Sequence, residues 1–366
     1  MSKSVATTSP LAEVRLWMEN RRLGVAYITR PVSIAYLTGF HAEPHERLMA
    51  LAVRPDGATL IVPSLEEEKA QAHASDADVV AWSDGEDPYE LVQRALGRGA
   101  EIGVEKEHLT LHGAEVLTSR TGATELLDVG EEIRRLRLIK HEDEIARLIR
   151  AAQITDDAYT HVVARLHAGM SEIEVALLVG SVIGELGGVL SFPTLVQSGP
   201  NSAMPHLEPS SRKLSAGDFV LIDYGAAYAG YKADSTRMAV IGEPSARHRE
   251  IHDVVLRAHD AAIAEVRPGA TTGDVDAAAR RVIEQAGYGK QFFHRVGHGL
   301  GLEGHEDPSL DPGSRTVLEV GMVFTIEPGV YIPGFGGVRI EDDVVVQTGG
   351  CLVLTSSDRS LRVIPG

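Results

Sequence analysis

Five potential metal ligands stand in five separate stretches of the C-terminal part of the chain, and each stretch is otherwise apolar or bounded by glycine. They are Asp223, Asp234, His298, Glu327 and Glu341, in FVLIDYG, YKADSTR, VGHGLG, FTIEPG and GVRIEDD. Taken singly, Asp223 or Glu327 could also cap a turn at a strand end. Burying an unpaired ionised carboxylate costs several kcal/mol or more, and two divalent cations would balance four carboxylates. The set of five therefore predicts a fold built around a two-metal site.

Neighbouring strands are predicted to carry the carboxylates. FVLIDYG and ADSTRMAVIG flank a turn around Gly230, which predicts a hairpin with Asp223 late in one strand and Asp234 early in the next. MVFTIEPG is predicted to be a strand closed by Pro-Gly, and GVRIEDDVVV is predicted to pair with CLVLT across the QTGG turn. Strand alternation places Asp342 on the face opposite to Glu341, so we expect a structural role for Asp342.

An internal repeat indicates how such strands are held. Residues 158–187 resemble residues 258–287, with matching alanine, valine, isoleucine and glycine positions. Each copy is predicted to contain a helix, a glycine turn, a cap at Ser171 or Thr271, and an amphipathic helix that ends at glycine. Chance agreement of common helix signals is the alternative. A true duplication predicts a pseudo-symmetric α+β domain whose site draws ligands from both halves.

The N-terminal part of the chain alternates predicted helices and strands. From Leu11 to about Gly130, helices are predicted at LAEVRLWMENRRLG and PYELVQRALGRG, and strands at VAYIT, IAYLTGF, ATLIV and ADVVAW. This order is typical of an α/β domain with a central mixed sheet. A charged helical stretch, EEIRRLRLIKHEDEIARLIRAAQ, is predicted to connect this domain to the next. We place the domains at residues 1–133 and 134–366.

Charge and cysteine content exclude several classes of protein. With 35 Lys and Arg against 52 Asp and Glu, the net charge of -17 disfavours nucleic acid and anionic membranes as partners. No GxGxxG stands between a predicted strand and a predicted helix, and there is no GxxxxGK[ST], so nucleotide binding lacks support. The single Cys351 fits a reducing compartment, and no apolar stretch is long enough for a signal peptide or a membrane span. We therefore expect a cytoplasmic protein.

The ligand types indicate which metals the site would hold. Carboxylates suit hard divalent cations, and the imidazole of His298 shifts the preference from Ca²⁺ toward transition metals. Manganese is the expected metal, with cobalt or zinc as alternatives. A pair of such ions lowers the pKa of water and polarises a carbonyl, which is the chemistry of hydrolysis.

The motifs together resemble those of the pita-bread metallopeptidases, and within them the Xaa-Pro dipeptidases (prolidases) and aminopeptidases P. The resemblance rests on LIDYGAAYAGYKADSTR, GHGLGLEGHE, FTIEPGVY and GVRIEDD, and on YLTGFHAEPHERLMAL, which is similar to the N-terminal domain of bacterial prolidases. It implies an α/β N-terminal domain with a mixed sheet, a pseudo-symmetric α+β pita-bread catalytic domain, two divalent metal ions per chain and a homodimer.

The same resemblance assigns roles to the five ligands. It implies that Asp223 binds one metal, that Asp234 and Glu341 bridge both, and that His298 and Glu327 complete the second. Glu327 would also accept a proton from the attacking water and return it to the leaving nitrogen.

Two further histidines, His206 and His305, match positions that face the substrate in the family, and Arg339 and Tyr331 are additional candidates for the pocket. His206 and His305 would bind the substrate carbonyl, the oxyanion or the proline, and a solvated loop histidine is the alternative for each. Arg339 would support the metal carboxylates or bind the substrate carboxylate, and Tyr331 would line the same pocket. His294 precedes His298 by the spacing HxxxH, but the neighbouring glycines disfavour a helix, so we expect His294 to support the site rather than to bind metal.

The expected function is hydrolysis of the Xaa-Pro bond by a dinuclear metal centre, preferably in dipeptides. An aminopeptidase P that acts on longer X-Pro peptides is the nearest alternative. A non-catalytic pita-bread module that binds peptides or proteins is a remote one. Gly304, Ala233 and Met238 depart from the family pattern, which leaves the shape of the substrate pocket open. The expected partners are small proline-containing peptides and a second copy of the chain.

Overall fold

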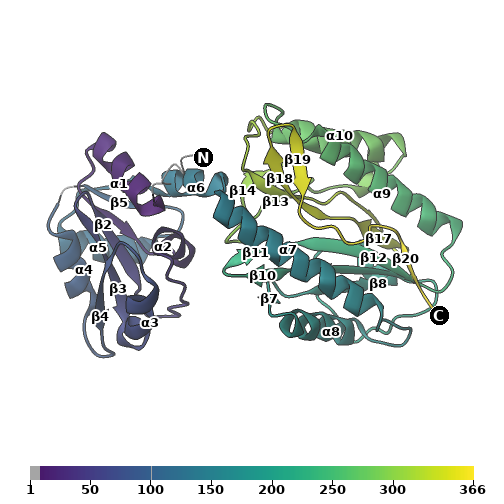
Figure 1. The fold of residues 1–366 in the computed structure, drawn as a ribbon, viewed down its shortest axis with the longest axis horizontal. Helices are drawn as coiled ribbons and strands as arrows, with labels where there is room; N and C mark the ends of the chain where they lie inside the picture. Colours follow the sequence, from purple (N-terminus) through teal and green to yellow (C-terminus); the bar gives the residue numbers. More distant parts are fainter. Residues whose placement is uncertain (1–8, 100) are drawn as a thin grey trace, which may run out of the picture. The chain divides into compact units, whose positions relative to one another are not determined.

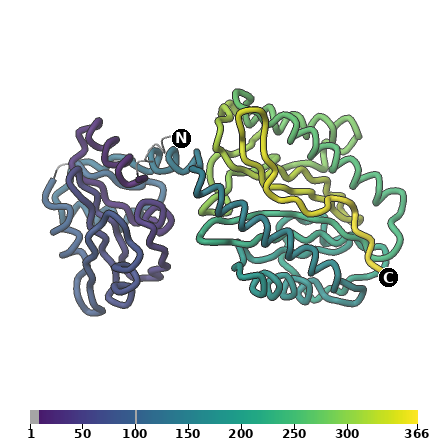
Figure 2. Tube along the Cα trace, in the orientation of Figure 1, coloured from purple at the N-terminus to yellow at the C-terminus, as the bar shows by residue number. Residues whose placement is uncertain are grey.

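The computed structural model describes residues 9–99 and 101–366. The chain divides into two compact units, Met1–Arg137 and Leu138–Gly366 (Figures 1 and 2). No helix in the described ranges is both long enough and apolar enough to cross a membrane.

The N-terminal unit is an α/β domain around a six-stranded sheet with the strand order β4-β3-β2-β1-β5-β6. Strand β1 pairs antiparallel with β2 and parallel with β5, which confirms the predicted mixed sheet. The strands are β1 Ala26–Ile28, β2 Ala50–Arg54, β3 Gly57–Pro63, β4 Asp78–Trp82, β5 Glu101–Val104 and β6 Glu125–Asp128. The helices are α1 Pro10–Arg21, α2 Pro31–Thr38, the short η1 Ser64–Glu66, α3 Glu67–His73, α4 Pro88–Leu96, α5 Leu111–Thr121 and α6 Gly130–Leu138.

The strand predicted at IAYLTGF is wrong, because this stretch belongs to helix α2. Pro31 occupies the first turn of the helix, where its fixed φ is favourable and its missing N–H is not needed. Gly39 ends the helix at φ 79°, in the left-handed region that favours glycine. The helix is buried on nearly all sides, so its sequence shows a short apolar run without helical periodicity.

The C-terminal unit contains two matching helix pairs. Its helices are α7 Glu142–Val163, α8 Glu172–Glu185, α9 Ala246–Glu265 and α10 Thr272–Gln285, with the short helices η2 Gly199–Ala203 and η3 Gly289–Gln291. Helix α8 begins with a capping box between Ser171 and Glu174, and α10 begins with the equivalent box between Thr271 and Asp274. The backbone amides of Glu174 and Asp274 donate to these hydroxyls at 3.2 and 3.1 Å. The predicted pseudo-symmetric α+β architecture is confirmed.

The strands of this unit form several small sheets, of which two carry the core. One has the order β20-β12-β9-β8 and the other β14-β13-β15-β18-β19. The bounds are β7 Val189–Leu190, β8 Leu195–Ser198, β9 Phe219–Tyr224, β10 Ala226–Tyr228, β11 Tyr231–Lys232, β12 Ser235–Ile241, β13 His298–Gly299, β14 Glu306–Ser309, β15 Val323–Ile326, β16 Gly329–Ile332, β17 Gly336–Arg339, β18 Asp342–Gln347, β19 Gly350–Val353 and β20 Arg362–Ile364.

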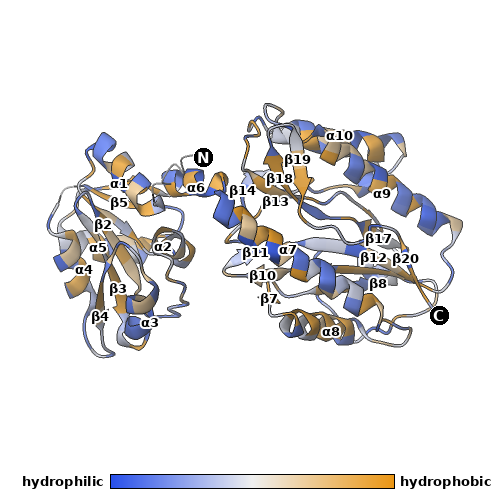
Figure 3. Cartoon of the chain, viewed as in Figure 1, coloured by the Kyte–Doolittle hydropathy of each residue, from blue (hydrophilic) through white to orange (hydrophobic). Residues whose placement is uncertain are grey.

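Strand β9 is buried on both faces by the two helix pairs. Phe219 and Leu221 pack in a cluster with residues of α9 and α10. Val220 and Ile222 pack in a second cluster with residues of α7 and α8. Helices α7 and α9 show hydrophilic residues interspersed with hydrophobic ones, as expected for helices that cover a core (Figure 3). Because side chains alternate along a strand, Asp223 points to the same side as Leu221.

The predicted hairpin between Asp223 and Asp234 is confirmed. Strands β9 and β12 pair antiparallel, with Asp223 opposite Thr236, and Asp234 lies directly before β12. The hairpin of β18 and β19 is also confirmed. However, the stretch GVRIEDDVVV is not one strand: β17 ends at Arg339 and pairs with β16, whereas β18 begins at Asp342 and pairs with β15 and β19. Glu341 lies at this change of partner.

Candidate active site

A cavity of about 850 Å³ lies within the C-terminal unit. All nine residues that the sequence predicts for the site line it, together with Lys232, Phe293, His294 and Arg295 among others: Asp223, Asp234, His298, Glu327, Glu341, His206, His305, Arg339 and Tyr331. The residues come from many elements, so the folded structure assembles one site from segments far apart in sequence.

Three of the predicted ligands form a cluster suited to a metal ion. One ligand atom from each of Asp234, His298 and Glu341 lies within 4.8 Å of the others, and all three residues are buried. The Nε2 atom of His298 lies 3.9 Å from Asp234 Oδ2 and 3.4 Å from Glu327 Oε1. Glu327 follows β15, and Asp223 lies on β9 opposite Thr236. The four carboxylates and the imidazole therefore converge, as the strand pattern predicts.

Glycines on both sides of His298 permit this placement. A Cβ atom at Gly297 would lie 1.9 Å from the carbonyl oxygen of Thr325, and one at Gly299 would lie 2.1 Å from that of Asp307. Both clashes are with backbone, which cannot move aside as a flexible side chain could. The glycines thus bring the His298 backbone close to its neighbouring strands and direct the imidazole into the cavity.

Arg339 is held by three polar neighbours. Its Nη2 donates to Asp223 Oδ2 at 2.5 Å, its Nη1 to the Tyr331 hydroxyl at 3.1 Å and its Nε to Thr236 Oγ1 at 3.0 Å. The Thr236 hydroxyl in turn donates to Glu341 Oε2 at 2.6 Å. The guanidinium therefore fixes Asp223 directly and orients Glu341 through Thr236.

His294 supports this network and does not join the ligand cluster. Its Nε2 lies 3.0 Å from the Tyr331 hydroxyl, and its Nδ1 lies 2.7 Å from the carbonyl oxygen of Arg295. Burial lowers the pKa of His294, which favours the neutral ring. Tyr331 is 1% exposed, and burial raises its pKa to about 12.

Burial and mutual repulsion destabilise the ionised carboxylates of the cluster, and a bound cation would stabilise them. Burial raises the pKa of Asp234 well above its ordinary value, and the carboxylates of Glu341 and Asp223 raise it further. Burial also raises the pKa of Glu341, with added repulsion from Glu327 and Asp223. Burial lowers the pKa of His298 to about 4, so its ring is neutral at pH 7. Without a cation, the raised pKa values of Asp234 and Glu341 favour their protonated forms.

The donor set fits divalent metal ions. The Oδ1 atoms of Asp223 and Asp234 are buried and have no hydrogen-bond partner among the described residues. Buried polar atoms are nearly always paired, so two orphaned oxygens at the centre of a carboxylate cluster indicate a missing positive partner. Carboxylate oxygens and a neutral imidazole are ligands for Mn²⁺, Co²⁺ and Zn²⁺.

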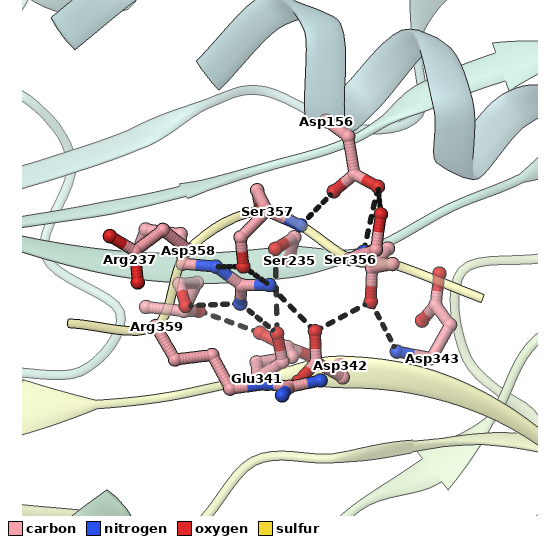
Figure 4. Close-up of polar contacts among 12 residues, drawn as sticks. Asp156, Ser235, Arg237, Glu341, Asp342, Asp343, Ser356, Ser357, Asp358 and Arg359 are labelled. Atoms are coloured by element: carbon pink, nitrogen blue, oxygen red, sulfur yellow. Dashed lines mark hydrogen bonds and ion pairs between the residues drawn. The ribbon is translucent and has the colours of Figure 1, made fainter. Parts of the chain in front are cut away.

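A second buried network, centred on Arg237 and Asp342, contacts the backbone of Glu341 (Figure 4). Arg237 on β12 is 1% exposed and donates from Nη1 to the carbonyl oxygen of Glu341 at 2.5 Å and from Nη2 to Asp342 Oδ1 at 2.6 Å. Asp342, which is fully buried, also meets Arg359 and lies 2.9 Å from His259 Nε2. The expected structural role of Asp342 is consistent with these contacts.

The segment that follows β19 also hydrogen-bonds to this network. Asp156 on α7 accepts hydrogen bonds from the backbone amides of Ser356 and Ser357 at 2.7 and 2.9 Å (Figure 4). The carbonyl oxygen of Ser357 accepts from Arg237 at 3.0 Å. The Asp343 side chain accepts a hydrogen bond from the backbone amide of Asp234 at 2.9 Å, which connects β18 to the residue directly before β12.

The two predicted substrate histidines lie on the open side of the cavity. His206 follows η2 and is exposed. His305 is also exposed, and its ring stacks on that of His298 with centroids 3.7 Å apart. Partial desolvation of the ring by the cavity wall, followed by the neighbouring His298, lowers the pKa of His305 to about 4, so the ring is neutral at pH 7. Arg295 Nη2 approaches His305 Nδ1 at 3.3 Å.

Sequence reasoning missed Thr236 and Lys232, which flank Asp234. Each is two residues from Asp234, so alternation along an extended chain places all three on one face. That spacing could have identified them. Phe293 and Arg295, by contrast, lie in an irregular stretch whose direction the sequence does not define.

Comparisons with known proteins agree with this geometry. Residues 146–348 match metallopeptidase family M24, and residues 10–139 match the creatinase/prolidase N-terminal domain. An uncharacterized peptidase of Staphylococcus aureus (strain USA300) is 39% identical over 344 residues, which cover 93% of this chain and 97% of that protein.

Solved structures of similar proteins share the whole fold. The prolidase from Pyrococcus horikoshii OT3 is 34% identical with a TM-score of 0.90, covering 97% of this chain and 100% of that one. The X-Pro aminopeptidase from Thermotoga maritima MSB8 is 32% identical with a TM-score of 0.90, covering 97% of this chain and 99% of that one. Together with the buried cluster of Asp234, His298 and Glu341, these matches establish that the chain belongs to metallopeptidase family M24, with an N-terminal creatinase/prolidase domain and a pita-bread catalytic domain.

Proposed function

We propose that this peptidase is a dinuclear metal-dependent Xaa-Pro dipeptidase. The observation that carries the proposal is the convergence of four carboxylates and His298 in a cavity, with two buried carboxylate oxygens lacking partners. The similarity to a prolidase over nearly the full length of both chains supports the substrate class. The similarity to an X-Pro aminopeptidase, with the same TM-score, keeps that activity as the alternative.

Two metal ions per chain would be held by five residues of the cavity: Asp223, Asp234, His298, Glu327 and Glu341. Manganese is the expected metal, with cobalt or zinc as alternatives, because all three accept this donor set. When bound, the ions lower the pKa of a water molecule and polarise the peptide carbonyl.

Glu327 is suited to moving the proton that hydrolysis requires. Its side chain is 16% exposed, so it reaches both the ligand cluster and the open cavity. It would accept a proton from the attacking water and return it to the proline nitrogen. The return matters because the nitrogen of an Xaa-Pro bond carries no hydrogen and leaves as an amine only after protonation.

The remaining residues would orient the substrate. His305, neutral at pH 7, can donate one ring N–H to the carbonyl oxygen as negative charge develops, and His206 lies on the same cavity wall. The contacts of Arg339 favour the first of its two expected roles, because its guanidinium is already engaged by Asp223, Tyr331 and Thr236. Tyr331 would form part of the pocket floor and hold Arg339 in place.

A comparison of peptide lengths tests the preference for dipeptides. With the metal-loaded protein, we expect kcat/KM for Ala-Pro to exceed that for Ala-Pro-Ala by about tenfold or more if the enzyme is a dipeptidase. Ala-Ala serves as the control for proline specificity. A higher value for Ala-Pro-Ala would identify an aminopeptidase P instead. The homodimer and the cytoplasmic location stay predictions.

A further inference from the structure

Lys232 projects into the same cavity as the ligand cluster. It lies on β11, two residues before Asp234, and both residues line the cavity. The residues on either side of Lys232 point the other way: Tyr231 and Ala233 belong to a buried apolar cluster, and the Tyr231 hydroxyl donates to Glu144 on α7 at 2.8 Å. The alternation therefore fixes Lys232 on the cavity side of the strand.

The ammonium group of Lys232 has no polar partner among the described residues. Its side chain forms no hydrogen bond or ion pair with any residue in the described ranges, although the residue is partly buried. Its backbone amide donates to the carbonyl oxygen of Gly301 at 2.9 Å, so the strand itself is anchored. Lys140, in contrast, is buried in an ion pair with Glu306 at 2.9 Å. An anion that meets Lys232 would displace no existing contact.

The charged side chains that line the cavity would also favour the binding of such an anion. Two divalent ions would neutralise the four carboxylates, which leaves the cations Lys232, Arg295 and Arg339 on the wall. Arg339 is already paired with Asp223. Arg295 donates to Ser309 Oγ at 2.7 Å and approaches the His305 ring, both neutral groups. Among the residues that the structure describes, no carboxylate pairs with Lys232 or Arg295, whereas an Xaa-Pro dipeptide with an uncharged first side chain brings one carboxylate.

We propose that Lys232 is a specificity residue that binds the side-chain carboxylate of an acidic residue preceding proline. The substrates favoured by this contact are Glu-Pro and Asp-Pro rather than their amide counterparts Gln-Pro and Asn-Pro. This inference rests on the proposed Xaa-Pro activity. A lysine side chain is long and flexible, so its ammonium can follow acidic side chains of either length.

Paired substrates that differ only in charge test the contact. The metal-loaded wild-type enzyme should cleave Glu-Pro with a kcat/KM about tenfold above that for Gln-Pro, through a lower KM. Lys232→Met keeps the apolar stem and removes the charge, so it should abolish this preference while Gln-Pro changes by less than about twofold. Lys232→Glu should reverse the preference, favouring Lys-Pro over Glu-Pro.

Lys213→Met is the matched control. Lys213 also lies in the C-terminal unit, but its side chain is 57% exposed, pairs with Glu174 and does not line the cavity. The control removes the same charge from the protein and should leave the ratio of Glu-Pro to Gln-Pro unchanged. A loss of preference in both variants would mean that long-range charge, and not contact with Lys232, sets the ratio, which would overturn the inference.

Binding measurements show which of the two substrate carboxylates, that of the side chain or that of the C-terminus, contacts Lys232. Isothermal titration calorimetry with metal-loaded Glu327→Gln measures the affinity for Glu-Pro, Gln-Pro and the two C-terminal amides, with and without Lys232→Met. Under the inference, Lys232→Met weakens Glu-Pro and its C-terminal amide about equally and spares both Gln-Pro forms. If Lys232 bound the C-terminal carboxylate instead, the change would weaken both free dipeptides and spare both amides.

The experiment also separates failure of the inference from failure of the proposed function. A wild-type enzyme that cleaves Glu-Pro and Gln-Pro equally well would overturn the role of Lys232 and leave Xaa-Pro hydrolysis in place. A metal-loaded enzyme that cleaves no Xaa-Pro peptide would overturn the proposed function itself.

Discussion

Glu327→Gln is expected to lower kcat for Ala-Pro by about a hundredfold or more, because general acid-base catalysis by a positioned side chain contributes about 10²–10⁴-fold. Glutamine keeps the size of the side chain and one carbonyl oxygen but cannot take a proton from water. The Oε1 atom of Glu327 lies 3.4 Å from His298 Nε2, so the variant should disturb the geometry of the cluster little. The measurement is steady-state turnover at saturating metal, with the bound metal counted in the same sample.

The matched control for this variant is Glu208→Gln. Glu208 is exposed and does not line the cavity, so the same chemical change there should leave kcat unaltered. If Glu327→Gln retains its metal and turns over at the wild-type rate, the proton-transfer role is refuted. If it loses metal, the metal count reveals a ligand defect, and activity regained at higher metal concentration would likewise contradict the proton-transfer role.

Arg237→Met is expected to lower the free energy of unfolding by about 3–5 kcal/mol, because it removes a charged partner of the buried Asp342 and the donor to the carbonyl oxygens of Glu341 and Ser357. Arg237 and Asp342 are 1% and 0% exposed and lie 2.6 Å apart. Burial alone would raise the pKa of Asp342, but Arg237, His259 and Arg359 outweigh it and keep the pKa well below the ordinary range. The carboxylate is thus charged and depends on its partners. Denaturant unfolding of the metal-free protein measures the effect.

The same variant should weaken metal binding, because Arg237 also holds the carbonyl oxygen of Glu341. Arg257→Met is the control: its ion pair with Asp253 is exposed on α9, and its loss should change the unfolding free energy by less than about 1 kcal/mol. A change of that small size for Arg237→Met, with unaltered metal affinity, would contradict the positioning role of the network in Figure 4.

The ligand positions were predictable because they violate the ordinary pattern of a buried strand. Asp223 ends an apolar run, and such a residue in a fully buried strand needs a specific partner. The duplicated caps at Ser171 and Thr271 likewise predicted the two helix pairs, because capping signals act locally. These features depend on residues a few positions apart, which the sequence alone displays.

The remaining features depend on tertiary contacts. The change of partner at Glu341 follows from β17 pairing with β16 while β18 pairs with β15, and no local signal marks it. The choice between two roles for Arg339 required its contacts with Asp223 and Tyr331. Helix α2 is buried on nearly all sides, so its apolar run lacks helical periodicity and resembles a buried strand in the sequence.

The most direct test of a dinuclear centre is a titration of metal-stripped protein with Mn²⁺, in which bound metal and Ala-Pro hydrolysis are followed together. Cobalt and zinc are then tested in the same way. Two ions should bind per chain, activity should be negligible in the stripped protein, and full activity should require the second ion. Wild-type activity after complete metal removal, or binding of no metal by the folded protein, would contradict the account.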